Sequence, residues 1–345
     1  MRIAISWNEL PCYAAHLIAA GIKGVDNPVQ VISTRPTIPI TGMEEILGQK
    51  VHWIDKDNIY TWEQLGLDVP EIYFQAGITY IPSLRRLGDQ VRKSGGRVVL
   101  LSDNCWKNSY RQWVGMVAFR VIYRKQFHAV WVPGASGVKL MRKLGVSAEN
   151  LFTGLYGSDP DIFFPKEVSL RREDKFIFVG QLIKRKGVDK LVAAFSRFHQ
   201  KHPEFQLDVY GAGPLASAVS GIKGINLRSF SKPETIAEAL KRSKFLILPS
   251  LEDHWPLIVS EAAMSGCGLL LSDKIGNIPE FANEKNSFIF NTTSDDALYE
   301  SMLMAAQCSE NTLNEISRES CRLGMKFTPS NWAINFKKII HEIAQ

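Results

Sequence analysis

The sequence predicts an α/β protein of two consecutive domains, each built around a parallel sheet. At 345 residues the chain is too long for one compact core. Short apolar runs alternate with helical stretches in both halves, a pattern typical of parallel βαβ units. A segment rich in Asp, Pro and Phe at 157–166 separates the two series. We therefore expect a first domain at 1–164, a second at 165–328, and a final helix within 329–345.

In the first half, strands are predicted wherever a short apolar run has the length of a buried strand. These runs lie at 2–6, 29–33, 51–54, 72–74, 98–101 and 129–132. Helical periodicity is clearest at 81–94 and 109–127.

The second half repeats the same alternation. Strands are predicted at 176–179, 206–210, 245–248 and 269–271, and helices at 187–202, 232–243 and 257–265. A last helix at 331–344 follows Pro329.

The composition is that of an ordinary globular protein, with 45% apolar and 22% charged residues. No run of about 18 apolar residues predicts a spanning helix, and the apolar start at 1–6 is too short for a signal peptide. The five cysteines are odd in number and lack metal-ligand spacing, which favours buried thiols in a reducing cytoplasm. No residue cluster suggests a metal site.

The most informative segment is 249–266. It leaves a predicted strand as a loop that contains Asp253, His254 and Trp255, and continues from Leu257 as a helix that carries Glu261. This order places the acids at the carboxyl edge of a parallel sheet, where open α/β folds bind ligands. Carboxylates suit sugar or ribose hydroxyls because they accept two hydrogen bonds. The alternative is structural, with Asp253 as a helix cap and Trp255 as packing.

Two further loops follow predicted strands. The first, at 180–187, places three basic residues before a helix N-terminus and suits a phosphate group, although a solvated basic turn is the alternative. The second contains Gly211 and Gly213, which allow close approach of the backbone to a ligand. It lacks the third glycine of a dinucleotide-binding fingerprint, so an ordinary strand-to-helix turn explains it equally well.

Taken in order, these motifs resemble the GT4 family of retaining glycosyltransferases, over roughly residues 150–300. The matching residues are Gly180-Gln181-Leu182…Lys186-Gly187, Gly211-Ala212-Gly213, Pro249-Ser250…Asp253-x7-Glu261-Ala262…Gly266 and Asp273…Gly276-Asn277-Ile278-Pro279-Glu280. The segment at 157–163 is similar to the stretch with which the family's second domain begins. The resemblance implies the GT-B fold: two Rossmann-like domains that face each other across a cleft, with the C-terminal helix packed back towards the first domain.

The resemblance also implies a role for each matching residue. Lys186 would bind the donor diphosphate, Glu261 the ribose hydroxyls and Asp253 the hydroxyls of the donor sugar. The backbone around Trp255, Pro256 and Leu257 would approach the sugar and the phosphates. The remaining donor-binding residues implied by position are Gln181, Arg185, Gly211, Gly213 and His254.

Three departures from the family pattern concern this site. The family's phosphate-binding Arg is Gln181 here, so Lys184 or Arg185 would have to supply the charge. Asp253 takes the place of the first Glu in the family's Glu-x7-Glu pair. Glu252 offers a competing register, but alignment on Trp255-Pro256-Leu257 favours Asp253. Many members carry a His after the fifth strand of the first domain, and this chain has none there. Asp103 is the candidate to face the sugar from this position. The alternative is that Asp103 caps a helix before Trp106.

Residues 81–145 carry thirteen Lys or Arg and two Asp, an excess of eleven positive charges. Aromatic, aliphatic and basic residues alternate at helical spacing in 110–125. Such a helix can lie on an anionic membrane, or it can be a core helix with a basic outer face. Nucleic-acid binding has no recognition motif to support it.

The resemblance implies a retaining, hexosyltransferase-type glycosyltransferase. We expect it to use a nucleotide-diphosphate sugar without a metal and to act on a saccharide acceptor, lipid-linked in bacterial surface polysaccharide or lipopolysaccharide assembly. We expect a cytoplasmic protein, and the basic stretch leaves open peripheral attachment to the inner face of the membrane. The alternative is a non-catalytic module on the same fold that binds sugar nucleotides or polysaccharide, which Gln181 and Asp253 keep open.

Overall fold

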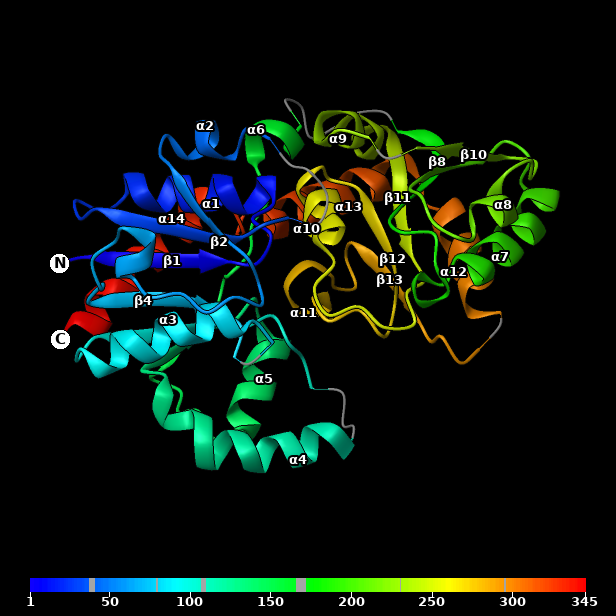
Figure 1. The fold of residues 1–345 in the computed structure, drawn as a ribbon. Helices are drawn as coiled ribbons and strands as arrows, with labels where there is room; N and C mark the ends of the chain where they lie inside the picture. Colours follow the sequence, from blue (N-terminus) through cyan, green and yellow to red (C-terminus); the bar gives the residue numbers. More distant parts are fainter. Residues whose placement is uncertain (37–40, 79, 107–109, 166–171, 230, 295) are drawn as a thin grey trace. The chain divides into compact units, whose positions relative to one another are not determined.

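The computed structural model describes residues 1–36, 41–78, 80–106, 110–165, 172–229, 231–294 and 296–345. The chain forms two compact α/β units (Figure 1). Unit 1 comprises Met1–Gly157 and Thr328–Gln345, and unit 2 comprises Ser158–Phe327. Lys166, at the end of the expected boundary segment, lies outside the described residues.

The first boundary therefore falls earlier than the 164/165 division expected from the sequence. The short helix α6 (Pro160–Phe163) belongs to unit 2 because its contacts are there. The Lys241 ammonium group of α9 (Pro233–Arg242) donates to the Ile162 carbonyl at 2.9 Å. Ser158 shares a hydrogen bond of 2.6 Å with Ser260 of α10 (Leu257–Met264).

In the described part of unit 1, seven parallel strands form one sheet in the order β3-β2-β1-β4-β5-β6-β7. The strands are β1 (Ile3–Trp7), β2 (Val29–Thr34), β3 (Val51–Ile54), β4 (Ile72–Ala76), β5 (Arg97–Leu101), β6 (Ala129–Trp131) and β7 (Leu151–Phe152). The helices are α1 (Cys12–Lys23), α2 (Met43–Leu47), η1 (Glu63–Leu65), α3 (Pro82–Lys93), α4 (Tyr110–Ala118), η2 (Phe119–Tyr123), η3 (Arg124–Gln126) and α5 (Ala135–Lys143). Residue 109, where the sequence placed the start of a long helix, lies outside the described residues.

The final helix, α14 (Pro329–Ala344), packs beside α1 on one face of the unit 1 sheet (Figure 1). Its Trp332 indole donates to the Leu155 carbonyl at 2.9 Å, stacks with Phe336 and packs at a tilt against Trp131. Gly21 of α1 makes room for this ring, because a Cβ there would lie 2.4 Å from Trp332. The C-terminal helix thus completes the core of unit 1, as the resemblance implied.

In the described part of unit 2, six parallel strands form a sheet in the order β10-β9-β8-β11-β12-β13. They are β8 (Glu173–Val179), β9 (Gln206–Tyr210), β10 (Ile225–Arg228), β11 (Ser243–Leu248), β12 (Gly268–Ser272) and β13 (Ser287–Phe290). The helices are η4 (Lys184–Lys186), α7 (Val188–Lys201), α8 (Ala216–Val219), α9 (Pro233–Arg242), α10 (Leu257–Met264), α11 (Ile278–Phe281), α12 (Ala297–Ala306) and α13 (Glu310–Gly324). Helices α9, α10 and α13 pack together, and α7 packs with α12.

A buried arginine connects several elements of unit 2. The Arg172 guanidinium donates to the carbonyls of Leu240, Ser243 and Ser265 at 2.8–3.0 Å, and to the Ser317 hydroxyl at 3.1 Å. These groups come from different helices and strands, so one side chain satisfies backbone acceptors that are distant in sequence. Burial lowers the pKa of Arg172 from its usual value.

None of the helices in the described ranges is both long enough and apolar enough to cross a membrane.

Candidate active site

The candidate site of unit 2 lies where the strand order reverses. From β8 the chain proceeds to β9 on one side, and from β11 it proceeds to β12 on the other, while β8 and β11 are neighbours. In open parallel sheets the loops that leave such a pair of strands at their carboxyl ends form the ligand-binding crevice. These two loops, 180–187 and 249–256, contain most of the site residues predicted from the sequence.

The two loops are joined by an ion pair between the Lys186 ammonium group and the Asp253 carboxylate. Their side chains are only 13% and 12% exposed, so water screens this pair poorly. Backbone contacts fix the same junction: the Leu251 amide donates to the Arg185 carbonyl at 2.8 Å, and the Arg185 guanidinium donates to the Glu252 carbonyl at 2.7 Å. The sequence predicted both charged groups but not that they contact each other.

Gly187 allows the basic loop to approach the second loop this closely. Its backbone is left-handed, with φ of 69°, and a Cβ would lie 2.1 Å from the Pro249 carbonyl oxygen. Only glycine fits at this position. The resulting turn places Lys186 directly before α7, whose first N–H groups have no capping side chain.

The Asp253 backbone is held from a third loop. Its amide donates to the Lys274 carbonyl at 3.2 Å, and its carbonyl accepts from the Gly276 amide at 2.8 Å. The buried Asn277 side chain donates to the Pro256 carbonyl at 3.0 Å, which fixes the start of α10. Asn277 was quoted in a motif but given no role in the sequence analysis, because this role depends on a contact between separate loops.

Trp255 and His254 point in different directions from this loop. The Trp255 ring is buried and packs at 5.8 Å from Phe281 and 6.0 Å from Phe327, so its side chain supports the loop from inside. His254 Nε2 lies 3.1 Å from a Glu252 carboxylate oxygen at the surface. Pro256 has no N–H, so the backbone donors available to an anion here are those of Leu257 and Ile258, at the uncapped start of α10.

Glu261 lies one turn into α10 and is partly buried. Desolvation by the surrounding protein raises the pKa of its carboxyl to about 7. Within the described residues nothing donates a hydrogen bond to the carboxylate or forms an ion pair with it. A ligand with adjacent hydroxyl groups would supply the donors that this carboxylate lacks.

The glycine loop contacts protein backbone. A Cβ at Gly211 would lie 1.9 Å from the Gly180 carbonyl oxygen, and one at Gly213 would lie 2.5 Å from the Leu182 carbonyl oxygen. The loop after β9 thus packs against the basic loop after β8, which positions Gln181 at the surface between them. Lys184 is also exposed, whereas Arg185 is held by the Glu252 carbonyl.

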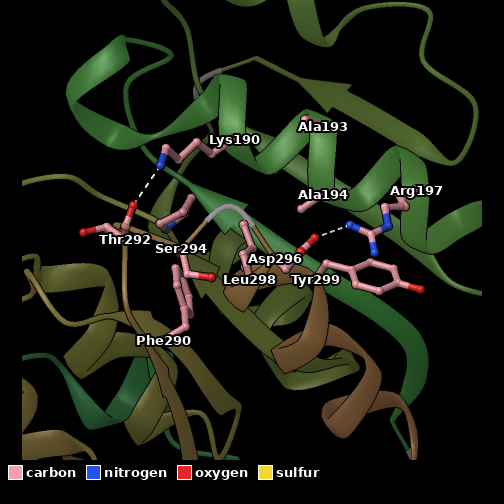
Figure 2. Close-up of a pocket in the computed structure, with 11 residues that line it drawn as sticks. Lys190, Ala193, Ala194, Arg197, Phe290, Thr292, Ser294, Asp296, Leu298 and Tyr299 are labelled. Atoms are coloured by element: carbon pink, nitrogen blue, oxygen red, sulfur yellow. Dashed lines mark hydrogen bonds and ion pairs between the residues drawn. The ribbon is translucent and has the colours of Figure 1, made fainter.

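A separate cavity of about 260 Å³ lies beside α7 and α12 (Figure 2). Lys190 of α7 donates to the Thr292 carbonyl at 2.8 Å. Arg197 pairs with Asp296, and its guanidinium lies 3.9 Å above the Tyr299 ring. None of the predicted site residues lines this cavity.

Asp103 lines a cavity of about 160 Å³ within unit 1, at the carboxyl ends of β1, β4 and β5. It is exposed and accepts a hydrogen bond of 3.2 Å from the Tyr156 hydroxyl. The rings of Trp7, Tyr13 and Tyr156 meet edge to face at 5.9–6.4 Å. Burial, with Tyr13 and Asp103 nearby, raises the pKa of Tyr156 well above its usual value. This aromatic group could not be predicted from the sequence, since its members come from separate segments.

In the part of the chain that the structure describes, no three His, Cys, Asp or Glu side chains gather as metal ligands would.

Residues 160–320, nearly all of unit 2, match the family model described as Glycosyl transferases group 1. A human protein, one of the subunits of phosphatidylinositol N-acetylglucosaminyltransferase, is 27% identical over 136 residues. That match covers 36% of this chain and only 27% of the human protein, so the chain spans about a quarter of the length of its curated relative.

Among solved structures, similarity extends over the whole chain at low identity. A glycosyltransferase from Rickettsia africae has a TM-score of 0.75 at 12% identity, covering 100% of this chain and 98% of its own. Anabaena HepE in complex with UDP has a TM-score of 0.77 at 10% identity, with 99% and 100% covered. Sucrose-phosphate synthase from Thermosynechococcus elongatus has a TM-score of 0.73 at 13% identity, with 100% and 99% covered. These likenesses show that the fold is GT-B.

Proposed function

We propose that this chain, a member of the group 1 glycosyltransferases, transfers a sugar from a nucleotide-diphosphate sugar to a saccharide acceptor with retention of anomeric configuration. One observation carries the proposal. The Lys186–Asp253 pair stands on two neighbouring loops where the strand order of unit 2 reverses, and the Glu261 carboxylate, which has no partner among the described residues, stands on the adjoining helix α10.

Each part of the donor has chemical partners in unit 2. Glu261 accepts the two ribose hydroxyls, which replace the water that folding removed from its carboxylate. The uncapped N–H groups of α7 and α10, with Lys186, bind the diphosphate. Lys184 supplies the charge that Gln181 lacks. Asp253 orients Lys186 and accepts hydroxyls of the donor sugar. Since HepE was solved with UDP and with glucose, UDP-glucose is the first donor to test.

The reaction needs charge stabilisation on the leaving group. As the bond between the anomeric carbon and the diphosphate oxygen breaks, its electron pair passes to the diphosphate, where Lys186 stabilises the added charge. The acceptor oxygen forms the new bond on the same face of the sugar, and its proton passes to a phosphate oxygen. The Lys186 ammonium group and helix N–H groups supply the charge stabilisation, so we propose a metal-independent transfer.

We propose that unit 1 binds the acceptor, at the cavity lined by Asp103 and Tyr156. An exposed carboxylate beside aromatic rings offers a saccharide both hydrogen bonds and an apolar face. A lipid-linked acceptor, as in bacterial surface polysaccharide or lipopolysaccharide assembly, has the support of the human relative, whose name pairs sugar transfer with phosphatidylinositol. The five free thiols favour the cytoplasm.

The test is sugar transfer or slow donor hydrolysis by purified protein. Lys186→Ala and Glu261→Ala are each expected to abolish turnover, by a factor of about 100 or more for the charge at Lys186. Lys186→Gln removes the charge but keeps a hydrogen-bond donor for Asp253, so it separates loss of the charge from unfolding of the loop. Lys285→Ala and Glu300→Ala, at exposed positions of unit 2, are the matched controls. Unchanged turnover in either site variant, with both variants folded, would refute the assignment.

The donor base is identified by thermal shift. A nucleotide that binds only the native state raises the melting temperature, so UDP, GDP and ADP and their sugars are compared, with and without EDTA. Binding without any turnover, even with membrane extract as acceptor, would favour the non-catalytic module that Gln181 and Asp253 keep open.

A further inference from the structure

Helix α4 carries a row of exposed apolar side chains. Tyr110 is 82% exposed, Val114 53%, Val117 60% and Val121, in the continuing helix η2, 75%. Their spacing of three or four residues places them along one side of the helix. Water is a poor solvent for such a continuous row, and large exposed apolar patches mark interaction sites.

The opposite side of the same helix packs on unit 1. Phe119 is buried there, and Met116 and Tyr123 pack against the cluster that contains α5 residues. The Gln112 amide donates to the Cys105 carbonyl at 2.8 Å. The helix thus packs on unit 1 through one side and exposes an apolar row on the other, beside the exposed cations Arg120 and Arg124.

Cations surround the row. Arg120 is exposed within the helix, and Arg124 and Lys125 are exposed directly after it. The Lys143 ammonium group lies 4.7 Å above the Trp106 ring and 5.9 Å from that of Trp113. Across 81–145, thirteen basic residues stand against two acids, although Lys107 lies outside the described residues.

We propose that α4 and η2 bind an anionic lipid bilayer, with Tyr110, Val114, Val117 and Val121 inserted at the headgroup level. A helix with an apolar row and adjacent cations matches the two layers of such a surface: acyl chains below and phosphates above. Trp113 and Tyr110, with a polar group on an apolar ring, suit the interface between them. The excess of positive charge favours anionic lipid over a second copy of this chain, which would bring the same charges together.

This proposal goes beyond the transfer reaction, since membrane binding is measured without any sugar nucleotide. It would also explain how a protein without a described spanning helix reaches a lipid-linked acceptor. Failure of one proposal leaves the other intact: an inactive Glu261→Ala protein is still expected to bind vesicles.

The experiment is sedimentation of the full chain with vesicles. We expect binding to vesicles of phosphatidylcholine with about a third phosphatidylglycerol, little binding to pure phosphatidylcholine, and weaker binding as salt shortens the range of the charges. Tryptophan fluorescence should shift to the blue on binding, because Trp113 is 46% exposed in the free protein.

Substitutions at exposed positions assign the surface. Val117→Glu and Val121→Glu should each weaken binding by at least about tenfold, the equivalent of leaving one such side chain in water. Arg124→Gln and Lys125→Gln should each weaken it by about fivefold. The matched control for the first pair is Ile334→Glu, which exchanges a 65% exposed isoleucine on helix α14.

Three results would overturn the proposal. The first is no binding to anionic vesicles by the folded wild-type protein. The second is equal loss in the Ile334→Glu control, which would indicate nonspecific adsorption. The third is a dimer in solution that Val117→Glu dissociates, which would identify a second copy as the occupant. Circular dichroism checks that each variant is folded.

Discussion

Glu261→Gln is expected to stabilise the free protein in a pH-dependent way. The carboxyl of Glu261 has its pKa raised from 4.5 to about 7 by desolvation alone. A group whose pKa is higher in the folded state favours folding while it is protonated, and this contribution is lost as pH rises through the folded value. The wild-type protein should therefore lose stability between about pH 4.5 and pH 7 on account of this residue.

The size of the effect follows from the shift. Each pKa unit corresponds to about 1.4 kcal/mol, so the full loss is about 3 kcal/mol above pH 7. Glutamine has the same shape and cannot ionise. Glu261→Gln should match the wild type near pH 4 and exceed its free energy of unfolding by roughly 3 kcal/mol near pH 8.

The assay is urea unfolding of both proteins across this pH range. Glu300→Gln, at an exposed position on α12, is the matched control and should show no such divergence. The same Glu261→Gln variant should bind nucleotide more weakly, since an amide accepts hydrogen bonds with only one oxygen. A constant difference between Glu261→Gln and wild type at all pH values would refute the desolvation argument.

Three other substitutions test the packing and the donor loop. Gly21→Ala should destabilise unit 1 by about 1–3 kcal/mol, because the new Cβ would lie 2.4 Å from the Trp332 ring; Gly115→Ala, which meets open space, should not. Arg172→Met should cost about 3 kcal/mol or more in the unfolding of unit 2, because buried carbonyls lose their donor. Gln181→Arg should tighten diphosphate binding about tenfold, measured by calorimetry, since charge-assisted hydrogen bonds add roughly 1.5–3 kcal/mol.

Each of these has a contradicting outcome. Equal melting temperatures for the Gly21→Ala and Gly115→Ala proteins would argue against close packing of α14 on α1. If the Arg172→Met protein were as stable as a control with the exposed Arg322 replaced by Met, the hydrogen bonds of the buried Arg172 would not contribute to stability. An unchanged dissociation constant in Gln181→Arg would mean that this position does not face the phosphates.

The strands and helices of unit 2 could be predicted because their signals are local. A buried parallel strand such as β11 is an uninterrupted apolar run, and α10 begins and ends at residues visible in the sequence. The short edge strands β7, β10 and β13 were not predicted: all three are partly exposed, and β7 and β10 have no such run. The loops at the switch point could be predicted from the order of motifs alone.

The contacts within the site could not be predicted from the sequence. Lys186 and Asp253 are distant in sequence, and only the adjacency of β8 and β11 brings them together. The Trp255 ring and the glycines at 211 and 213 contact protein in the structure, whereas the donor role expected near Trp255 belongs to the backbone. A sequence pattern shows that a residue is needed at a position, but it does not separate support of a loop from contact with a ligand.

The sequence by itself determined the α/β class, the motif order and the charge of residues 81–145, because periodicity and composition are properties of neighbouring residues. Only the tertiary structure decided which charges pair, that the Glu261 carboxylate has no hydrogen-bond or ion-pair partner among the described residues, and that one side of α4 exposes a row of apolar side chains. The physical reason is the same in each case. Burial and desolvation depend on what other segments cover a side chain, and that is fixed by packing between residues far apart in the chain.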